Sequence, residues 1–426
     1  MSQKNTANWL LYSGGLLGLF LINNTLAIML IYRYDPGVEN PDNLPLLIPS
    51  ALVGLAMFSS RCLGASIQPL VGYYSDRNWS RWGKRKPFIA AALLPLVICF
   101  ILLFVPPQNQ SSISTLIYLI TTLVLFYLAL ACYQIPYLAW LPTLASTKDA
   151  QVSLATLMAV ASMIGTAISG TATPLLTQQY GFKFMCIMVG TVGFTTLSLP
   201  LAIEEKFTTL PQTQLSFRKS LQFACQNRTF ISYLVGLTSA WISISIVSVI
   251  PTFIAVALLQ RNIGFGSVIN VVALLGIICG FLLVTPMVNL WGKKATFQLS
   301  MVWLASGLLI LSIYSIVFEQ TLPWLSLLFI TYIGLASFFV LPNAMLPDVI
   351  ARDRSLPESK GEAIYFGTRG LIVEIGIGLG FCIASILLML GKTVEQPYGV
   401  IAALLTAIIF ALLSAWTFNF YPKSTG

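Results

Sequence analysis

Long apolar stretches alternate with short polar connections along the whole chain. Each stretch holds roughly 20 or more mainly apolar residues, the length that crosses a bilayer as an α-helix. The strand-length alternation that a membrane β-barrel needs is absent, so the pattern predicts helices. We therefore expect an all-α integral membrane protein. Twelve spans are predicted, at residues 8–32, 45–74, 88–106, 114–141, 153–177, 182–203, 229–256, 267–290, 296–317, 324–346, 363–390 and 398–421.

Two of the connections are longer than the rest, at residues 204–228 and 347–362. The first divides the chain into two expected six-helix bundles, 1–203 and 229–426, joined by a cytoplasmic linker at 204–228. Apolar and basic residues mix between Leu215 and Arg228, which predicts an amphipathic helix at the membrane surface. The first apolar stretch runs on without a cleavage site, so we expect the amino end to be retained.

Composition agrees with a membrane protein, because 57% of the residues are hydrophobic and 9% are charged. If both termini are cytoplasmic, the inner segments hold 17 Lys and Arg and the outer loops hold four. This asymmetry indicates that orientation, in a plasma or inner membrane. The inner set is Lys4, Arg77, Arg81, Lys84, Arg85, Lys86, Lys148, Lys206, Arg218, Lys219, Arg228, Lys293, Lys294, Arg352, Arg354, Lys360 and Lys423, and the outer set is Arg33, Lys183, Arg261 and Lys392.

Short motifs recur six spans apart. The run Trp82-Gly-Lys-Arg85 follows Pro69, and the run Trp291-Gly-Lys-Lys294 follows Pro286. The segment from Pro136 to Pro142 is echoed by the segment from Pro342 to Pro347. Parallel repeats, related by an axis along the membrane normal, give this spacing. Twelve helices in two such halves resemble the architecture of the major facilitator superfamily.

The basic connection G-Y-Y-S-D-R-N-W-S-R-W-G-K-R-K-P-F, residues 72–88, resembles the signature loop of that superfamily. In its members the loop helps to hold the inward gate shut, through an acidic residue that pairs with a neighbouring helix end. The alternative reading of the basic residues is a topology anchor, and we expect both roles together. The resemblance implies gate-motif positions at Gly72, Asp76, Arg81, Gly83, Lys84 and Arg85.

Further segments narrow the resemblance. The run from Gln68 to Arg77, followed by Ser80 to Ala90, looks like the sucrose transporter family. The segments at 81–87, 346–350 and 361–365 look like the wider glycoside-pentoside-hexuronide:cation symporter family, which includes melibiose permease. The resemblance implies a secondary active transporter that moves a sugar or glycoside by alternating access.

The chain departs from melibiose-type permeases at the coupling site. Their acidic residues on helices 2 and 4 correspond to Gly64, Gln68 and Gln134, so no carboxylate remains there. Their sugar-gripping Asp and Arg are replaced near Phe20 and Ala159. Because a sodium cage usually includes a carboxylate, we do not expect sodium coupling, and proton-coupled symport is the preferred reading.

Three ionisable residues other than Tyr and Cys lie well inside the predicted spans, namely Arg61, Arg369 and Glu374. Charges at that depth are costly unless they pair or face a wet cavity. We expect Glu374 to pair with Arg61 or Arg369 and a proton or substrate to compete for that pairing. A static structural ion pair is the alternative.

Polar and aromatic side chains on the predicted helices could bind a neutral polyol. Helix packing through the same groups is the alternative for any one of them. The candidate substrate-binding residues are Asn23, Asn24, Gln68, Tyr133, Gln134, Tyr137, Trp241 and Tyr365.

The sequence contains no motif for catalysis, phosphate binding or metal binding. The chain has no His, no phosphate-binding Gly-rich loop and no cluster of metal ligands. We expect no enzyme activity, no cofactor, no metal and no nucleic-acid partner, since the net charge of +9 has no soluble basic domain to carry it. We expect the protein to bind a small sugar as its substrate, to lie in the lipid bilayer and to be a monomer. Two rival functions remain open: a carrier of a lysolipid-like amphiphile, and a non-transporting membrane scaffold on the same fold.

Overall fold

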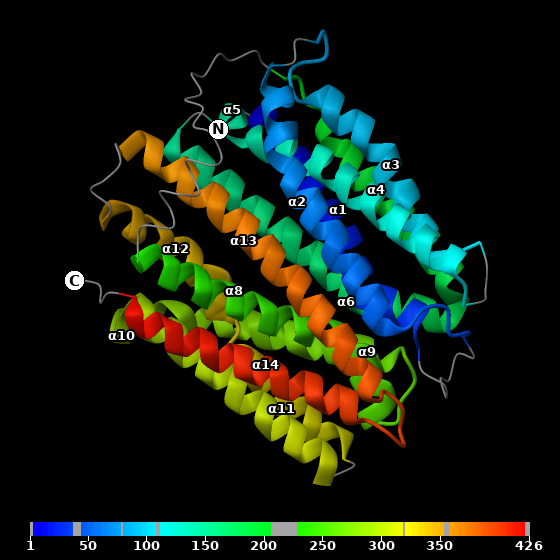
Figure 1. Cartoon of the computed structure of the whole chain (residues 1–426). Helices are drawn as coiled ribbons and strands as arrows, with labels where there is room; N and C mark the ends of the chain where they lie inside the picture. The colour runs from blue at the N-terminus through cyan, green and yellow to red at the C-terminus, as the bar shows by residue number, and fades with distance from the viewer. Residues whose placement is uncertain are drawn as a thin grey trace. The chain divides into compact units, whose positions relative to one another are not determined.

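Helices account for nearly all regular backbone in the computed structural model of the chain (Figure 1). The structure describes residues 3–36, 44–77, 80–107, 111–145, 147–205, 228–317, 320–352 and 358–421. Within these ranges the β-type pairing is limited to one isolated bridge between Ser80 and Gly83. A helix satisfies its own backbone hydrogen bonds, which is why apolar stretches of this length take this form in lipid.

The chain divides into two units of packed helices, and the first contains Met1–Pro211 with Asn262–Ser267. In the first unit α1 packs along α6, while α2 and α3 both pack along α4 (Figure 1). Its elements are α1 (Gln3–Tyr34), α2 (Ser50–Arg77), α3 (Lys86–Phe104), α4 (Ile113–Ala139), α5 (Leu141–Leu144), α6 (Lys148–Ser198) and the 3₁₀ turn η1 (Leu199–Ala202).

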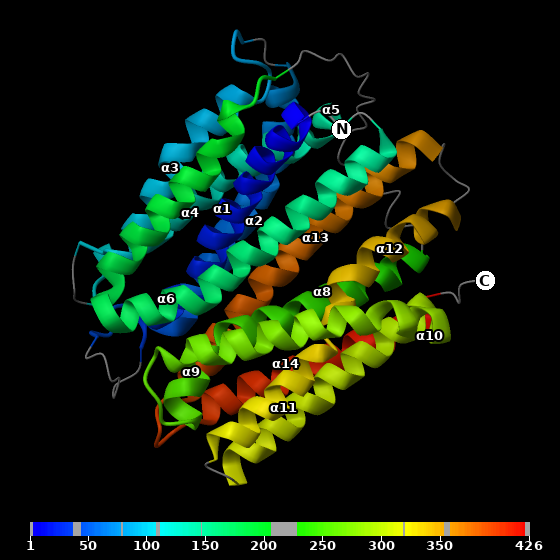
Figure 2. The ribbon, with the colours of Figure 1, turned by 180° about the vertical axis from the view of Figure 1, so that it is seen from behind.

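The second unit contains Gln212–Arg261 and Val268–Gly426. Here α8 packs along both α13 and α14 (Figure 2). Its elements are α8 (Arg228–Val249), α9 (Pro251–Phe253), the π-helical turn η2 (Ile254–Leu258), α10 (Phe265–Val317), α11 (Thr321–Ile333), α12 (Ala336–Arg352), α13 (Glu358–Leu387), η3 (Leu388–Leu390), α14 (Tyr398–Thr417) and η4 (Phe418–Phe420).

The elements labelled α6 and α10 each comprise two helices that meet at a kink, and together these exceed the length of one membrane crossing. α6 has 51 residues and α10 has 53; a straight helix of 50 residues would be about 75 Å long, against a hydrocarbon core of about 30 Å. Each contains one glycine with non-helical backbone, Gly181 (φ 79°) in α6 and Gly292 (φ 77°) in α10. The predicted spans 153–177 and 182–203 therefore lie on either side of Gly181 as two helices, and the spans 267–290 and 296–317 lie likewise on either side of Gly292.

Ten helices in the described part of the chain are long and apolar enough to cross a membrane. Large apolar side chains such as Leu94, Leu282 and Leu290 stay exposed on them. In water such a surface would be unfavourable, whereas in lipid it is the expected outer face.

The predicted spans 229–256 and 324–346 are interrupted. α8 ends at Val249 before Pro251, which lacks the amide proton that would continue the helix. α11 ends at Ile333 and α12 begins at Ala336. Between them Leu335 N–H donates to the Tyr332 carbonyl at 3.1 Å instead of the carbonyl four residues back. The predicted span 324–346 falls within one segment of membrane-spanning character, Thr321–Leu346, which contains a turn at Gly334 and Leu335.

Most of the predicted linker 204–228, including the amphipathic segment 215–228, lies outside the described residues.

Candidate functional site

A close approach between α1 and α6 places two polar side chains in contact. A Cβ on Gly165 would lie 2.4 Å from the Leu17 carbonyl oxygen, so glycine is what allows the two backbones to come together. One residue along, Asn24 Nδ2 on α1 donates to Thr166 Oγ1 on α6 at 2.9 Å. Asn23, also on α1, is half-buried, and its Oδ1 has no hydrogen-bond partner among the described residues. The predicted asparagines thus lie at a helix seam with unused hydrogen-bonding capacity.

Arg61 is held inside the first unit by an aromatic ring. Its side chain is only 5% exposed, and its guanidinium carbon lies 5.4 Å from the centroid of the Tyr127 ring on α4. Attraction to the ring face favours a cation within about 6 Å of the centroid. A Cβ on Gly64, one turn further along α2, would lie 2.9 Å from Tyr127 Cβ. Glycine at position 64 therefore lets α4 approach α2 closely next to Arg61.

Gln68 and Gln134 continue this seam. They come seven residues after Arg61 and Tyr127 respectively, two turns along the same face of each helix. Both glutamine side chains are half-buried, so their amides remain accessible. The spacing thus places Gln68 on the same face of α2 as Arg61, and Gln134 on the same face of α4 as Tyr127.

Tyr133 and Tyr137 have a different environment from the glutamines. Tyr137 is fully buried and stacks on Tyr12, with ring centroids 4.4 Å apart. The Tyr12 hydroxyl donates to the Tyr137 carbonyl at 2.5 Å, and the Tyr137 hydroxyl donates to the Tyr12 carbonyl at 2.6 Å. Tyr133 is also fully buried, and its hydroxyl donates to the Leu197 carbonyl at 2.7 Å. The hydroxyls of Tyr133 and Tyr137 donate hydrogen bonds that connect α4 to neighbouring helices. This supports helix packing, and not substrate binding, as the role of both tyrosines.

The second unit carries the remaining interior candidates. Trp241 on α8 is half-buried and meets Phe338 on α12 edge to face, with ring centroids 4.9 Å apart. Tyr365 on α13 is 1% exposed and packs edge to face on Phe230, at 4.4 Å between centroids. Trp241 thus keeps an accessible ring, whereas Tyr365 does not.

Arg369 and Glu374 are both half-buried on α13. They are five residues apart, which places them about 140° apart around a helix. Thr238 on α8 lies 2.7 Å from where a Cβ on Gly376 would be, so α13 packs closely on α8 just beyond Glu374. Arg61 belongs to the other unit, and its pairing with Glu374 stays a prediction.

The basic connection is organised around a carboxylate that the motif did not predict. Glu205, just after η1, accepts hydrogen bonds from the Arg85 N–H at 3.0 Å and the Lys86 N–H at 3.3 Å, at the amino end of α3. Gly83 has φ 113°, and a Cβ there would lie 2.0 Å from Glu205 Oε2. The acidic pair at 204–205, directly after a long apolar stretch in a chain with 14 acidic residues, was the available signal.

The other gate-motif residues take varied positions. Arg85 Nη1 donates to Thr143 Oγ1 at 3.2 Å, just beyond α4. Arg81 is exposed and Lys84 half-buried. A Cβ on Gly72 would make an ordinary contact with Ile135 at 3.6 Å. The Asp76 side chain lies outside the described part of the structure, so its predicted role as a latch remains a prediction.

The second repeat of the motif, at residues 291–294, contacts the middle of α12 through Lys293 and the end of η4 through Lys294. Lys293 Nζ donates to the Ala344 carbonyl at 3.1 Å on α12. Lys294 Nζ donates to the carbonyls of Asn419, at 2.9 Å, and of Tyr421. Ammonium groups are favourable at the carboxyl ends of helices, where carbonyls lack partners.

Among the described residues no group of three or more His, Cys, Asp or Glu gathers as metal ligands would.

Comparison with known proteins identifies the class of molecule that carries this site. A family model described as "MFS/sugar transport protein" matches residues 11–424. The inner membrane symporter YicJ of Escherichia coli is 26% identical over 187 residues, which are 42% of this chain and 40% of that protein. The glucuronide carrier protein homolog of the same organism is 25% identical over 259 residues, 59% of this chain and 56% of that protein.

A symporter of Synechocystis, sll1374, aligns over a greater length. It is 20% identical over 443 residues, covering 82% of this chain and 79% of that protein. Among solved structures, the crystal structure of a bacterial homolog of the human lysosomal transporter Spinster, in an inward-facing and unoccupied conformation, has a TM-score of 0.68. At 10% identity over 100% of both chains, that likeness shows a shared fold.

Proposed function

Since the chain belongs to the MFS/sugar transport protein family, we propose that it is a secondary active transporter that moves a sugar or glycoside across a membrane by alternating access. The match extends over residues 11–424, and the predicted resemblance to glycoside-pentoside-hexuronide:cation symporters is confirmed by it and by relatives such as YicJ. The protein is an integral, multi-pass membrane transporter and not an enzyme.

The observation that carries the sugar assignment is the set of accessible polar and aromatic side chains inside the spans. Asn23, Gln68 and Gln134 are half-buried amides, and Trp241 offers an aromatic ring. A polyol needs hydrogen-bonding groups around its edge and a flat apolar surface for its ring; the amides of the first unit are of the former kind, and the Trp241 ring of the second unit is of the latter kind. These four residues and Asn24 are the proposed substrate contacts.

The proposed topology has twelve crossings in two pseudo-symmetric bundles, with both termini cytoplasmic. The kinks at Gly181 and Gly292 support it, because each separates α6 or α10 into two helices that can supply two crossings. The proposed bundles are residues 1–203 and 229–426. We place the protein in a plasma or inner membrane, as YicJ is an inner membrane symporter.

We further propose that Glu374 couples transport to protons. It is the one acidic residue within the predicted spans, and α2 and α4 carry Gly64, Gln68 and Gln134 where related permeases have carboxylates. Replacing Glu374 by Gln keeps the shape of the side chain and removes its ability to ionise. A proton gradient should then no longer drive accumulation, while exchange of substrate across the membrane continues.

The test is uptake of radiolabelled sucrose, maltose and melibiose into proteoliposomes, with and without an inward proton gradient. We expect gradient-driven uptake of at least one sugar, reduced by Glu374→Gln to the level without a gradient. Glu395→Gln is the matched control, because Glu395 is exposed beyond the end of α13. Unchanged gradient-driven uptake in Glu374→Gln would remove this residue from coupling. Absence of any sugar uptake by folded protein would overturn the sugar assignment, and lysolipid analogues would be tested next.

A further inference from the structure

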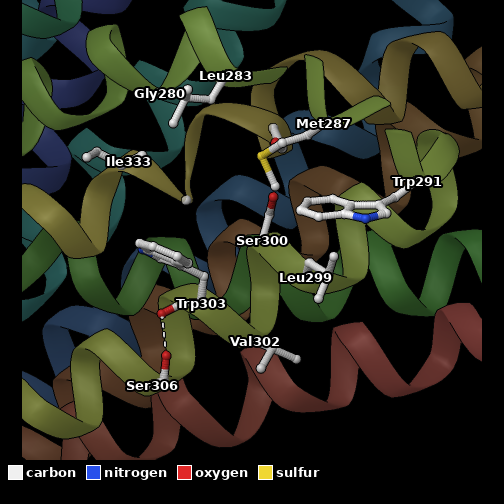
Figure 3. Close-up of a pocket in the computed structure, with 12 residues that line it drawn as sticks. Gly280, Leu283, Met287, Trp291, Leu299, Ser300, Val302, Trp303, Ser306 and Ile333 are labelled. Atoms are coloured by element: carbon white, nitrogen blue, oxygen red, sulfur yellow. Dashed lines mark hydrogen bonds between the residues drawn. The ribbon is translucent and has the colours of Figure 1, made fainter. Parts of the chain in front are cut away.

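The second unit contains a hollow of about 340 Å³, and none of the candidate sugar-binding residues lines it (Figure 3). The two arms of α10 form its walls, and the turn between α11 and α12 contributes its floor. The volume is in the range of small-molecule sites, which begin at about 300 Å³. Lining residues that bear on its chemistry are Gly280, Met287, Trp291, Trp303, Ile333 and Gly334.

Small residues and one tryptophan create this hollow. A Cβ on Gly280 would lie 2.2 Å from the Ile333 carbonyl oxygen, so only glycine allows α10 to approach the end of α11 this closely. A Cβ on Gly334 would lie 2.6 Å from Trp303 Cδ1. The Trp303 indole N–H donates to the Ile330 carbonyl at 2.9 Å, in the last turn of α11, where the helical ladder is interrupted. The contacts of Gly280, Gly334 and Trp303 therefore determine the shape of the hollow.

Two of the three serines that line the hollow, Ser300 and Ser306, donate their hydroxyl protons within the protein, whereas the structure shows no hydrogen bond to a described residue for the third, Ser337. Ser300 Oγ donates to the Thr296 carbonyl at 2.8 Å, and Ser306 Oγ donates to the Trp303 carbonyl at 2.9 Å (Figure 3). The Trp303 indole is engaged as described above. A sugar or an ordered water molecule would find few hydrogen-bond partners here, whereas a hydrocarbon loses nothing by entering.

The open side of the hollow lies on the apolar outer surface of the spans. Leu283, Trp291 and Trp303 are each about half exposed, at 47%, 53% and 48%. They belong to the apolar segment Phe265–Ser315, and the floor belongs to Thr321–Leu346, both of membrane-spanning character. With these two segments in a bilayer, the exposed apolar side chains at the hollow would contact hydrocarbon. An empty hollow would forfeit dispersion contacts on all its walls.

We propose that this hollow binds one acyl chain of a bilayer phospholipid. Trp291 lies at its end next to Gly292, where α10 bends, and tryptophan is the residue favoured at membrane–water interfaces. The acyl chain of the lipid enters the hollow beside Trp291 and lies over the turn between α11 and α12. Because no sugar contact lines the hollow, lipid binding and sugar transport are separate properties.

Photolabelling tests this binding directly. The purified protein in detergent is titrated with a phosphatidylcholine that carries a diazirine in its acyl chain, irradiated, and its adducts are mapped by mass spectrometry. We expect adducts at Leu283, Met287 and Trp303 that saturate with probe concentration. Adducts on the outer face of α14, at Ile409, should rise linearly. A linear rise at both places would overturn the proposal, and this comparison needs only the unmodified protein.

A filling substitution provides the second test. Ser306→Phe places a ring at the edge of the hollow. It should raise the probe concentration that gives half-maximal labelling about tenfold, which corresponds to a loss of about 1.4 kcal/mol of binding free energy. Ser326→Phe is the matched control, because Ser326 is an exposed serine on α11 that does not line the hollow. Equal labelling of Ser306→Phe and Ser326→Phe would contradict a chain in the hollow. Displacement of the probe by melibiose would also overturn it and assign the hollow to substrate.

Discussion

At the residue scale, burial separates the candidate sugar contacts into two groups. The tyrosines Tyr133, Tyr137 and Tyr365 are fully buried, whereas Gln68, Gln134 and Trp241 are half-buried. A tyrosine that donates to a carbonyl on another helix stabilises the bundle through a hydrogen bond shielded from water. Residue type alone could not distinguish these cases, since both groups carry the polar and aromatic chemistry that a polyol requires.

This separation predicts the effect of removing one hydroxyl. Tyr137→Phe removes the buried hydrogen bond from the Tyr137 hydroxyl to the Tyr12 carbonyl. The variant should lose about 1–3 kcal/mol of unfolding free energy, measured by thermal unfolding in detergent. Sugar uptake per folded molecule should stay near the wild-type value. The control is Tyr180→Phe, because Tyr180 is 61% exposed. A selective rise in KM with unchanged stability in Tyr137→Phe would instead return this residue to the substrate site.

At the element scale, each copy of the basic motif fixes the amino or carboxyl ends of neighbouring helices. In the first unit a carboxylate, Glu205, accepts from N–H groups at the start of α3. In the second unit an ammonium group, Lys294, donates to carbonyls at the end of η4 and just beyond it. The charges are opposite because the helix ends are opposite. The basic residues of the motif therefore do more than set the orientation of the chain in the membrane.

The contact between Gly83 and Glu205 can be tested with a matched pair of glycines. Gly83 and Gly181 both have positive φ, but a Cβ would meet Glu205 at Gly83 and nothing within 4 Å at Gly181. Gly83→Ala should therefore destabilise the protein by about 1–3 kcal/mol more than Gly181→Ala. Chemical or thermal unfolding in detergent measures the difference. Equal loss in the two variants would show that backbone strain alone acts at Gly83, without a contribution from Glu205.

At the scale of the whole molecule, the proposed topology rests on the bends within α6 and α10. If each bend reverses the chain, Lys183 lies on the outer side of the membrane and Arg81 on the inner side. Both side chains are exposed, so labels can reach them. The family match over residues 11–424 extends over both proposed bundles.

Labelling with an impermeant maleimide checks this topology. Lys183→Cys and Arg81→Cys are made in a background whose seven native cysteines are replaced by serine. We expect Lys183→Cys to react on intact cells and Arg81→Cys to react only after the membrane is made permeable. The cysteine-free parent protein is the control for background labelling. Reaction of both positions from the same side would exclude the twelve-crossing arrangement.

The sequence by itself determined the class of the molecule. Apolar length, loop charge and the motif at residues 72–88 indicated a multi-pass helical transporter, because hydrophobic matching and the positive-inside rule act locally along the chain. The tertiary structure decided the rest: which candidate side chains are spent on packing, that Glu205 holds the basic connection, that the helix predicted over 324–346 breaks near Gly334, and that Gly280 and Trp303 frame a hollow. These features depend on contacts between residues far apart in the chain, and no pattern of neighbouring residues encodes such contacts.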